Sequence, residues 1–357
     1  MVSWYTQFKA AILSLLGMTA STPSTTIASI SQGMYNEISY FSRMVNTAYC
    51  ANAPITPLRT DFSCGDSCQY FANLKLDSIF GGNFYSTSAT GLLAHDHKRK
   101  EKYVLFRGTF SIPDAYTDIQ FQKSPWLAKL PNGVVPKIQS AGGQPLTCEG
   151  CAVHDGFAKA FNETLKNSGH QFDKFLANHT DYKLYVVGHS LGGAMAQMFA
   201  VRLKLMGYDP TLITYGQPRV GNKEYAEFVS RLFFNDESGL LVDENRRLYR
   251  VTHWNDIVVG LPNFADYTHS VGEVFIASED LNPPVESVTL CEGAENEACH
   301  RGHFSLWERV KILHNHLAYI NYIGYCALNI GRRSILNMPN YRGKNTYAHK
   351  SETTKDE

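Results

Sequence analysis

The sequence predicts one α/β domain built on a central, mostly parallel sheet. Short apolar runs with the character of strands alternate with amphipathic segments, and such alternation is typical of a sheet covered by helices on both faces. The chain has 357 residues, of which 44% are hydrophobic, so it can bury a large core as a single domain. In sheets of this kind, functional side chains gather on loops beyond the carboxyl ends of the strands.

Several of the expected strands are continuous runs of apolar or β-branched residues, which suggests a sheet buried on both faces. They cover residues 92–96, 102–106, 184–187, 211–215 and 248–253. Apolar residues at helical spacing predict helices over residues 155–166, 191–207 and 223–234.

The balance of charge argues against a nucleic-acid partner. The 33 basic and 33 acidic residues give a formal net charge of zero, whereas a nucleic-acid surface needs an excess of lysine and arginine. We therefore expect the substrate to be recognised by the chemistry of a site, with no cofactor, and the protein to be a monomer.

The two ends of the chain differ from its body. Residues 1–20 carry one lysine, an apolar run and then small residues, which is typical of a secretory signal peptide. The alternative is an uncleaved N-terminal segment that retains the protein in the secretory pathway. This run is too short to cross a bilayer, and no other apolar run is long enough. Residues 327–357 are polar and basic, which predicts a disordered tail after a domain at 21–326.

The cysteines and two glycosylation sequons favour export. An even number of cysteines suits disulfides in an oxidising compartment, although eight allow 105 pairings. A split zinc site made of the two closely spaced cysteine pairs is the alternative, and we expect no metal. The sequon asparagines are Asn162 and Asn178, and the cysteines are Cys50, Cys64, Cys68, Cys148, Cys151, Cys291, Cys299 and Cys326.

The most informative motif is the G-x-S-x-G pattern formed by Gly188, Ser190 and Gly192. By itself the pattern is weak, because a tight turn with a bystander serine would look the same. Here an apolar run precedes it and a helical pattern follows, which is the strand-turn-helix setting that exposes a nucleophilic serine. The start of the helix also supplies free N–H groups that favour a developing negative charge.

A serine nucleophile needs a histidine base and an acid that orients it, and in this kind of turn the order along the chain is serine, acid, histidine. Asp256 stands in the loop that leaves the strand at 248–253, whereas the rivals Asp236, Asp243 and Asp266 lie in polar connections. The histidines that follow are His269, His300, His303, His314 and His316. We expect His300 and His303 to be exposed, and the pattern alone does not choose among the candidates.

Taken together, these residues resemble the class 3 lipases, particularly the secreted yeast lipases, over residues 35–326. The matching segments occur in the family's order: 106–109, 153–157, 188–193, 216–222, 251–258 and 315–319. The resemblance implies an α/β-hydrolase-like fold with a short helical lid. It also implies a triad of Ser190, Asp256 and His316, with the backbone N–H groups of Thr109 and Leu191 as the oxyanion hole.

The same resemblance implies four disulfides: Cys50 with Cys326, Cys64 with Cys68, Cys148 with Cys151, and Cys291 with Cys299. His154 and His253 match family motifs too, and we expect both to form structural hydrogen bonds. The lid corresponds to residues 110–121, where an apolar face would consist of Ile112, Ala115, Tyr116 and Ile119.

The resemblance implies a secreted triacylglycerol lipase that acts on lipid esters at an oil–water interface. The alternatives are a feruloyl or other soluble carboxylesterase on the same scaffold, and a lipid-binding relative without turnover. Three departures from the family concern substrate preference rather than hydrolysis: Val259-Gly260 replaces a proline-bearing loop, the tail is longer, and Asp114 and Asp118 make the lid more polar.

Overall fold

The computed structural model describes most of the expected domain. The described residues are 24–51, 53, 57–81, 89–109, 122–126, 128, 130, 137, 146–234, 238–240, 246–263, 266–303, 312–324 and 326. The predictions for the signal peptide, the lid at 110–121 and the tail at 327–357 lie outside these residues.

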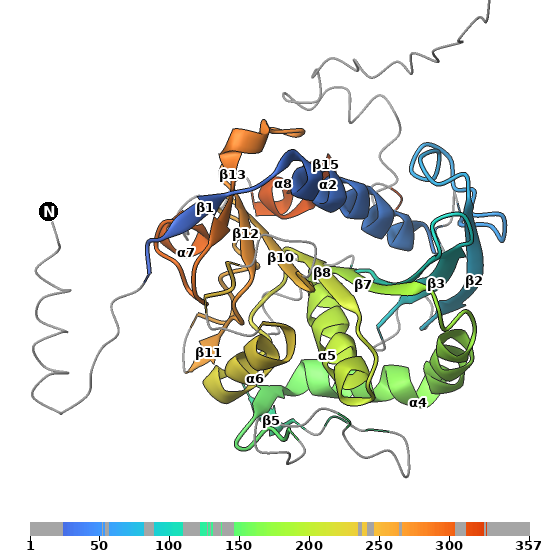
Figure 1. Cartoon of the computed structure of the whole chain (residues 1–357), viewed down its shortest axis with the longest axis horizontal. Helices are drawn as coiled ribbons and strands as arrows, with labels where there is room; N and C mark the ends of the chain where they lie inside the picture. The colour runs from blue at the N-terminus through green and yellow to red at the C-terminus, as the bar shows by residue number, and fades with distance from the viewer. Residues whose placement is uncertain are drawn as a thin grey trace, which may run out of the picture.

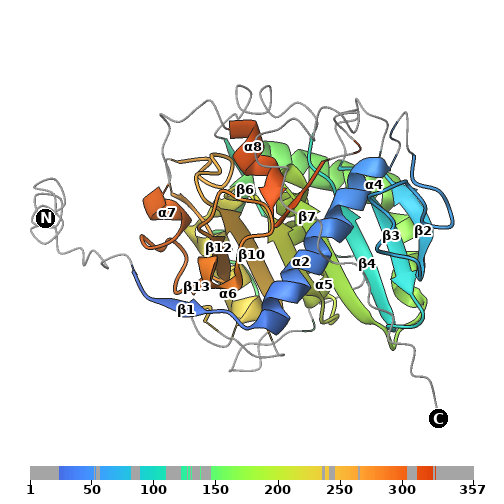
Figure 2. The same cartoon turned by 90° about the horizontal axis from the view of Figure 1, so that it is seen from above.

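Within the described residues, nine strands form one central sheet (Figures 1 and 2). The five inner strands are parallel, and antiparallel strands are added at both edges. In order across the sheet, the strands are β1 (Ile27–Ser29), β13 (Val288–Cys291), β12 (Glu273–Ile276), β10 (Leu248–His253), β8 (Thr211–Tyr215), β7 (Lys183–His189), β4 (Glu101–Phe106), β3 (Gly91–Asp96) and β2 (Leu74–Phe80).

Helices cover both faces of the sheet. Figure 2 shows α2 (Gln32–Thr47) crossing one face, and α4 (Asp155–Ala177), α5 (Leu191–Leu205) and α6 (Lys223–Phe233) pack on the other. Side chains of one strand alternate between the two cores, as the pleat requires. Thus Tyr185 and Val187 join the core under α2, whereas Leu184 and Val186 join the core under the other three helices.

The remaining elements are short and lie at the margins of the sheet. A small antiparallel sheet contains β5 (Lys123–Pro125), β6 (Ala152–His154), β9 (Gly221–Asn222) and β11 (Tyr267–Thr268). Near the C-terminal end of the described chain are α7 (His300–His303), α8 (Ile312–Leu317) and the pair β14 (Ala318–Tyr319) and β15 (Asn321–Tyr322), and two 3-10 turns lie at Ala48–Cys50 and Val285–Ser287.

The predicted fold class is confirmed, and each of the five predicted strands and three predicted helices is present. The helix that begins at Asp155 is longer than predicted and continues to Ala177. The sequence pattern does not predict α2, the edge strands β1, β2 and β13, or the inner strand β12.

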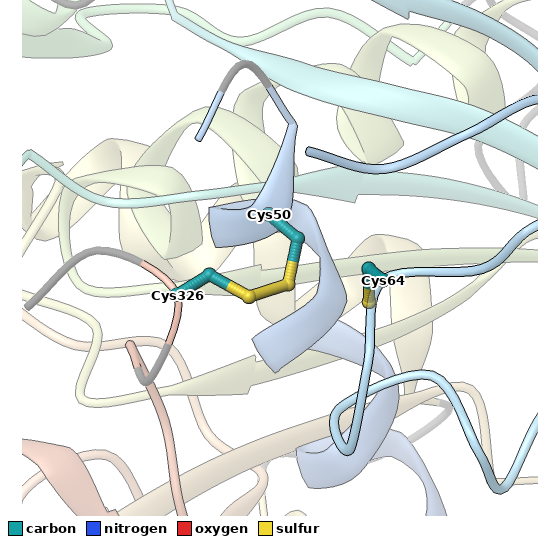
Figure 3. A group of neighbouring side chains, drawn as sticks. All are labelled: Cys50, Cys64 and Cys326. Atoms are coloured by element: carbon teal, nitrogen blue, oxygen red, sulfur yellow. A yellow bond between two sulfur atoms is a disulfide. The ribbon is translucent and has the colours of Figure 1, made fainter. Parts of the chain in front are cut away.

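Four disulfides join the cysteines in the pairs that the family resemblance implies. Cys50 follows α2 and Cys326 follows β15, so this bond joins positions 276 residues apart (Figure 3). The sulfur of Cys64 lies beside this bond, but Cys64 is itself bonded to Cys68. Since no cysteine is free, the alternative zinc site has no thiolate to use in this structure.

Among the described residues, no helix has both the length and the apolar composition needed to span a membrane.

Candidate active site

Ser190 lies in a sharp turn between β7 and α5, at the carboxyl edge of the parallel strands. Its backbone has φ +59° and ψ −133°, a conformation that non-glycine residues seldom adopt. The two glycines of the motif make this turn possible by their lack of a side chain. A Cβ on Gly188 would lie 2.2 Å from the Gly192 carbonyl oxygen, and one on Gly192 would lie 2.5 Å from the carbonyl oxygens of Phe106 and Arg107.

The close contact of Gly192 with the end of β4 brings two candidate oxyanion-hole segments together. Leu191 precedes Gly192, and Thr109 follows β4 by three residues. Between them, Gly108 is packed so tightly that an added Cβ would lie 2.7 Å from Ser190 Cβ. Thr109 and Leu191 are both half-buried. The two backbone segments therefore flank the serine at the same edge of the sheet.

Asp256 and His316 form a buried hydrogen-bonded pair, although they come from different parts of the chain. Asp256 follows β10, and His316 belongs to α8. The His316 Nδ1 atom lies 3.0 Å from Oδ1 and 2.9 Å from Oδ2 of Asp256, and both side chains are fully buried. Tyr319 donates a hydrogen bond to Oδ2, and the Val258 N–H donates one to Oδ1. The carboxylate is thus held from three directions.

Electrostatics keeps this carboxylate ionised. Burial alone would raise the pKa of Asp256, but the His316 ring and the hydrogen bonds from His316 and Tyr319 outweigh burial and lower that pKa below its ordinary value. An ionised carboxylate at Nδ1 requires that the proton of the imidazole sits on Nδ1, which leaves Nε2 as the basic nitrogen.

The Nε2 atom of His316 is buried and makes no hydrogen bond to the described residues. The turn that holds Ser190 and the segment that contacts the His316 ring are nevertheless adjacent. Ser190 N–H donates to the Tyr215 carbonyl at 2.9 Å, and a Cβ on the next residue, Gly216, would lie 2.9 Å from His316 Cε1 and 3.0 Å from Asp256 Oδ2. A hydrogen bond between Ser190 and His316 is not formed here, and such bonds are often long before substrate binds.

A second histidine, His189, connects the parts of the site in a way that the sequence did not predict. Its Nε2 lies 2.8 Å from the His316 carbonyl oxygen, so this nitrogen carries the proton and donates. Its Nδ1 then accepts from the Tyr49 hydroxyl at 2.6 Å, and that hydroxyl accepts from Gly108 N–H at 2.9 Å. Burial, reinforced by the nearby His316 ring, lowers the pKa of His189 to about 3, so the ring is neutral.

The rival acids lie elsewhere. Asp266 forms an ion pair with Lys123 on the small sheet, and Asp236 and Asp243 lie outside the described residues. None of the described rivals contacts a histidine through its carboxylate as Asp256 does.

Of the other histidines, His300 differs from the prediction. It is buried rather than exposed, and its Nε2 lies 2.7 Å from the carbonyl oxygen of Asp256, so it contacts the loop that carries Asp256. His303 is exposed as predicted. His269 is buried with Nε2 2.9 Å from the Val259 carbonyl oxygen, and His314 is half-buried in α8, two residues before His316.

Two histidines in family-like motifs occupy structural positions. The ring nitrogens of His253 lie 3.0 Å and 2.8 Å from the carbonyl oxygens of Asn315 and Ser278, so this ring ties the end of β10 to α8. The ring of His154 packs on Phe157 at the start of α4. The proposed lid residues Ile112, Ala115, Tyr116 and Ile119 lie outside the described residues.

A family model and the similar proteins of known name indicate the same family, the class 3 lipases. The family model described as lipase (class 3) matches residues 103–265. The secreted mono- and diacylglycerol lipase 2 of Gibberella zeae is 31% identical over 303 residues, which cover 78% of this chain and 71% of that protein. Lipase A of Sodiomyces alcalophilus is 29% identical, with 80% of this chain and 73% of that protein covered.

The similar solved structures are lipases as well. The Lip2 lipase of Yarrowia lipolytica is similar with a TM-score of 0.74 and 37% identity, over 84% of this chain and 98% of that one. The mono- and diacylglycerol lipase of Aspergillus oryzae is similar with a TM-score of 0.66 and 26% identity, over 83% and 99% of the two chains.

Proposed function

The chain belongs to the class 3 lipase family and is a carboxylic ester hydrolase, and from this premise we propose that it is a secreted triacylglycerol lipase with Ser190, His316 and Asp256 as its catalytic triad. The observation that carries the proposal is the buried His316 ring. One of its nitrogens is fixed by an ionised carboxylate, and the other is without a partner among the described residues, at the edge of the sheet where Ser190 lies.

The proposed reaction proceeds through an acyl-enzyme. His316 Nε2 takes the proton of Ser190 Oγ as that oxygen attacks the ester carbonyl carbon, and Asp256 stabilises the imidazolium that forms. The imidazolium then protonates the departing alcohol oxygen, which breaks the ester bond and leaves an acyl group on Ser190. Water attacks this acyl group, His316 takes the proton from the water, and the fatty acid leaves as the proton returns to Ser190.

The oxyanion of each tetrahedral intermediate would be bound by the N–H groups of Leu191 and Thr109, with help from the Thr109 hydroxyl. Donors of this kind are worth about 2.7–4 kcal/mol each when they are fixed in place. The contact of Gly192 with the end of β4 supports this assignment, because it limits how far the two segments can separate.

The names of the relatives support the proposed substrate class. The proteins compared above carry the printed names of lipases or of mono- and diacylglycerol lipases. A lid at 110–121 with Ile112, Ala115, Tyr116 and Ile119 on its apolar face would bring the site to an oil–water interface. This chain would then act on emulsified acylglycerols without a cofactor or metal.

Secretion is the second part of the proposal. Four disulfides suit an oxidising compartment, and one of the relatives is named as secreted. Of the two sequon asparagines, Asn178 is exposed at the end of α4 and Asn162 is half-buried within it. We propose both as glycosylation sites, with residues 1–20 removed as a signal peptide. Retention by an uncleaved N-terminal segment is the competing outcome.

One experiment tests the substrate. The secreted protein and its Ser190→Ala variant are compared on emulsified triacylglycerols of several acyl lengths, on mono- and diacylglycerols, and on a dissolved feruloyl ester. The proposal predicts release of fatty acid from emulsified triacylglycerol by the wild type alone. Turnover of the dissolved ester only would make the protein a soluble carboxylesterase, and binding of lipid without any turnover would make it a non-catalytic relative.

A further inference from the structure

Three histidine side chains meet at the end of the sheet that is opposite to Ser190. His95 is the fifth residue of β3, His97 begins the turn that leads to β4, and His179 follows α4. One ring nitrogen from each histidine can be chosen so that all three atoms lie within 4.8 Å of one another. The turn lies at the amino ends of β4 and β7, and β7 runs about 20 Å from there to the serine.

Each of two rings is oriented by a partner behind it. His95 Nδ1 lies 2.7 Å from Asp77 Oδ2, and His97 Nδ1 lies 2.7 Å from the Tyr182 hydroxyl. The carboxylate reaches His95 because Asp77 is the extra residue of a bulge in β2, between the paired positions Leu76 and Ser78. His179 is held by stacking on Tyr182, with ring centroids 4.7 Å apart.

These partners turn the Nε2 atoms of His95 and His97 toward each other, 3.1 Å apart. Without a metal, the Nε2 atoms can share one proton while Tyr182 donates to His97. If Asp77 and Tyr182 both accept protons from the Nδ1 atoms, both Nε2 atoms instead keep a free lone pair and can bind an ion. Two imidazole nitrogens bound to a tetrahedral zinc ion lie about 3.3 Å apart, which is close to the spacing seen here.

We propose that His95, His97 and His179 bind a divalent transition-metal ion of the zinc, copper or nickel class, with Asp77 and Tyr182 as partners that orient the ligands. Neutral imidazoles favour these ions over Mg²⁺ and Ca²⁺, which prefer oxygen ligands. A carboxylate behind a metal-bound histidine is the usual way of fixing its tautomer. His97 and His179 are exposed, so small ring rotations close the site and an ion enters from solvent.

Such an ion would join the β3–β4 turn to the segment between α4 and β7. It lies too far from Ser190 to take part in ester hydrolysis. Its effect would be on stability, since a ligand that binds only the folded chain raises the melting temperature.

The test uses Zn²⁺ alone. Full-length secreted protein without a histidine tag is treated with chelator and deglycosylated, because Asn178 adjoins His179, and is then titrated with ZnCl₂ by calorimetry. The expected result is saturable binding of one ion per chain. At a free zinc concentration of 100 times Kd, the melting temperature should rise by roughly 5 °C.

Variants identify the ligands. The double variant His97→Gln/His179→Gln should weaken zinc binding by about 100-fold or more, and Asp77→Asn by about 10–100-fold. The matched control is His170→Gln, which changes an exposed histidine of α4 outside the cluster. Near-ultraviolet circular dichroism checks that each variant is folded. Equal zinc affinity in the wild type and the folded double variant, or no saturable binding by the wild type, would overturn the proposal.

Discussion

The hydroxyl of Tyr319 offers a direct test of how the acid of the site is held. It donates to Asp256 Oδ2 in a fully buried position, and Tyr319→Phe removes only that oxygen. A hydrogen bond to a charged group is worth about 1.5–3 kcal/mol. Because Oδ2 keeps His316 Nδ1 at 2.9 Å, it is not left without a partner, and we expect a loss of about 2 kcal/mol in the free energy of unfolding.

Activity should fall as well. Without the Tyr319 hydroxyl the carboxylate is less well oriented and stabilises the His316 imidazolium less. We expect kcat for a soluble ester at pH 7–8 to drop by about tenfold, which corresponds to about 1.4 kcal/mol in the barrier. The stability loss is measured by urea unfolding at pH 7, and the activity by initial rates with the same preparation.

The matched control is Tyr215→Phe. The Tyr215 hydroxyl is equally buried but donates to an uncharged acceptor, the Ile38 carbonyl, so its loss should cost about 1 kcal/mol and leave kcat nearly unchanged. The pH provides a further check. The pKa of Asp256 is lowered in the folded chain, so the stability that it contributes is present above pH 4 and is lost as the pH falls further. Equal losses of stability and unchanged kcat in both variants would refute the reasoning.

Three further predictions follow from the same geometry. Tyr49→Phe removes the hydroxyl that accepts from Gly108 N–H and donates to His189. It should lower kcat for a soluble ester severalfold and reduce the free energy of unfolding, measured with urea, by about 1–3 kcal/mol. A variant with wild-type kcat and stability would contradict the role of this hydroxyl. Gly192→Ala should abolish activity or folding, because the added Cβ would overlap the backbone atoms of Phe106 and Arg107. A Cβ added at Gly169 in α4 meets no atom within 4 Å, so Gly169→Ala should unfold at a slightly higher urea concentration than the wild type. Similar effects of the two substitutions would count against the packing argument. Because the pKa of buried His189 is lowered to about 3, the unfolded chain binds a proton between about pH 3 and 6.5 that the folded chain does not. Burial lowers the pKa of His253, His269 and His300 as well, so these rings act in the same direction. Stability should therefore fall as the pH drops below about 6.5, by up to about 1.4 kcal/mol per pH unit for each such ring; urea unfolding at pH 5 to 7 tests this, and a flat profile would exclude it.

The parts of the fold that the sequence predicted are those with a strong local pattern. Residues 184–187 before Gly188 are a continuous apolar run, and apolar residues recur at helical spacing from Leu191 until Gly207. By contrast, β12 contains Glu273, a charged residue that is buried because Arg250 on the neighbouring strand pairs with it at 3.2 Å. No local pattern reveals a charge that is compensated from another strand.

In the candidate site, too, local sequence predicts some residues and does not reveal those that depend on contacts between distant segments. The motif around Ser190 and the loop position of Asp256 follow from local sequence, but the pattern could not choose His316 from five candidates, and the family resemblance did so. His300 was expected to be exposed because its loop is polar, yet it is buried against the Asp256 carbonyl. The contacts of Tyr49 and Tyr319 arise from tertiary packing, and nothing in the surrounding sequence signals them.

The central claim is that Ser190 is the nucleophile and that His316 is its base. The most direct measurement is labelling with a fluorophosphonate, which forms a covalent bond to an activated serine oxygen, followed by mass spectrometry of the peptides. We predict one adduct per chain, located on Ser190, absent in Ser190→Ala and formed much more slowly in His316→Gln. An adduct on another residue, or ester hydrolysis at the wild-type rate by Ser190→Ala, would contradict the claim.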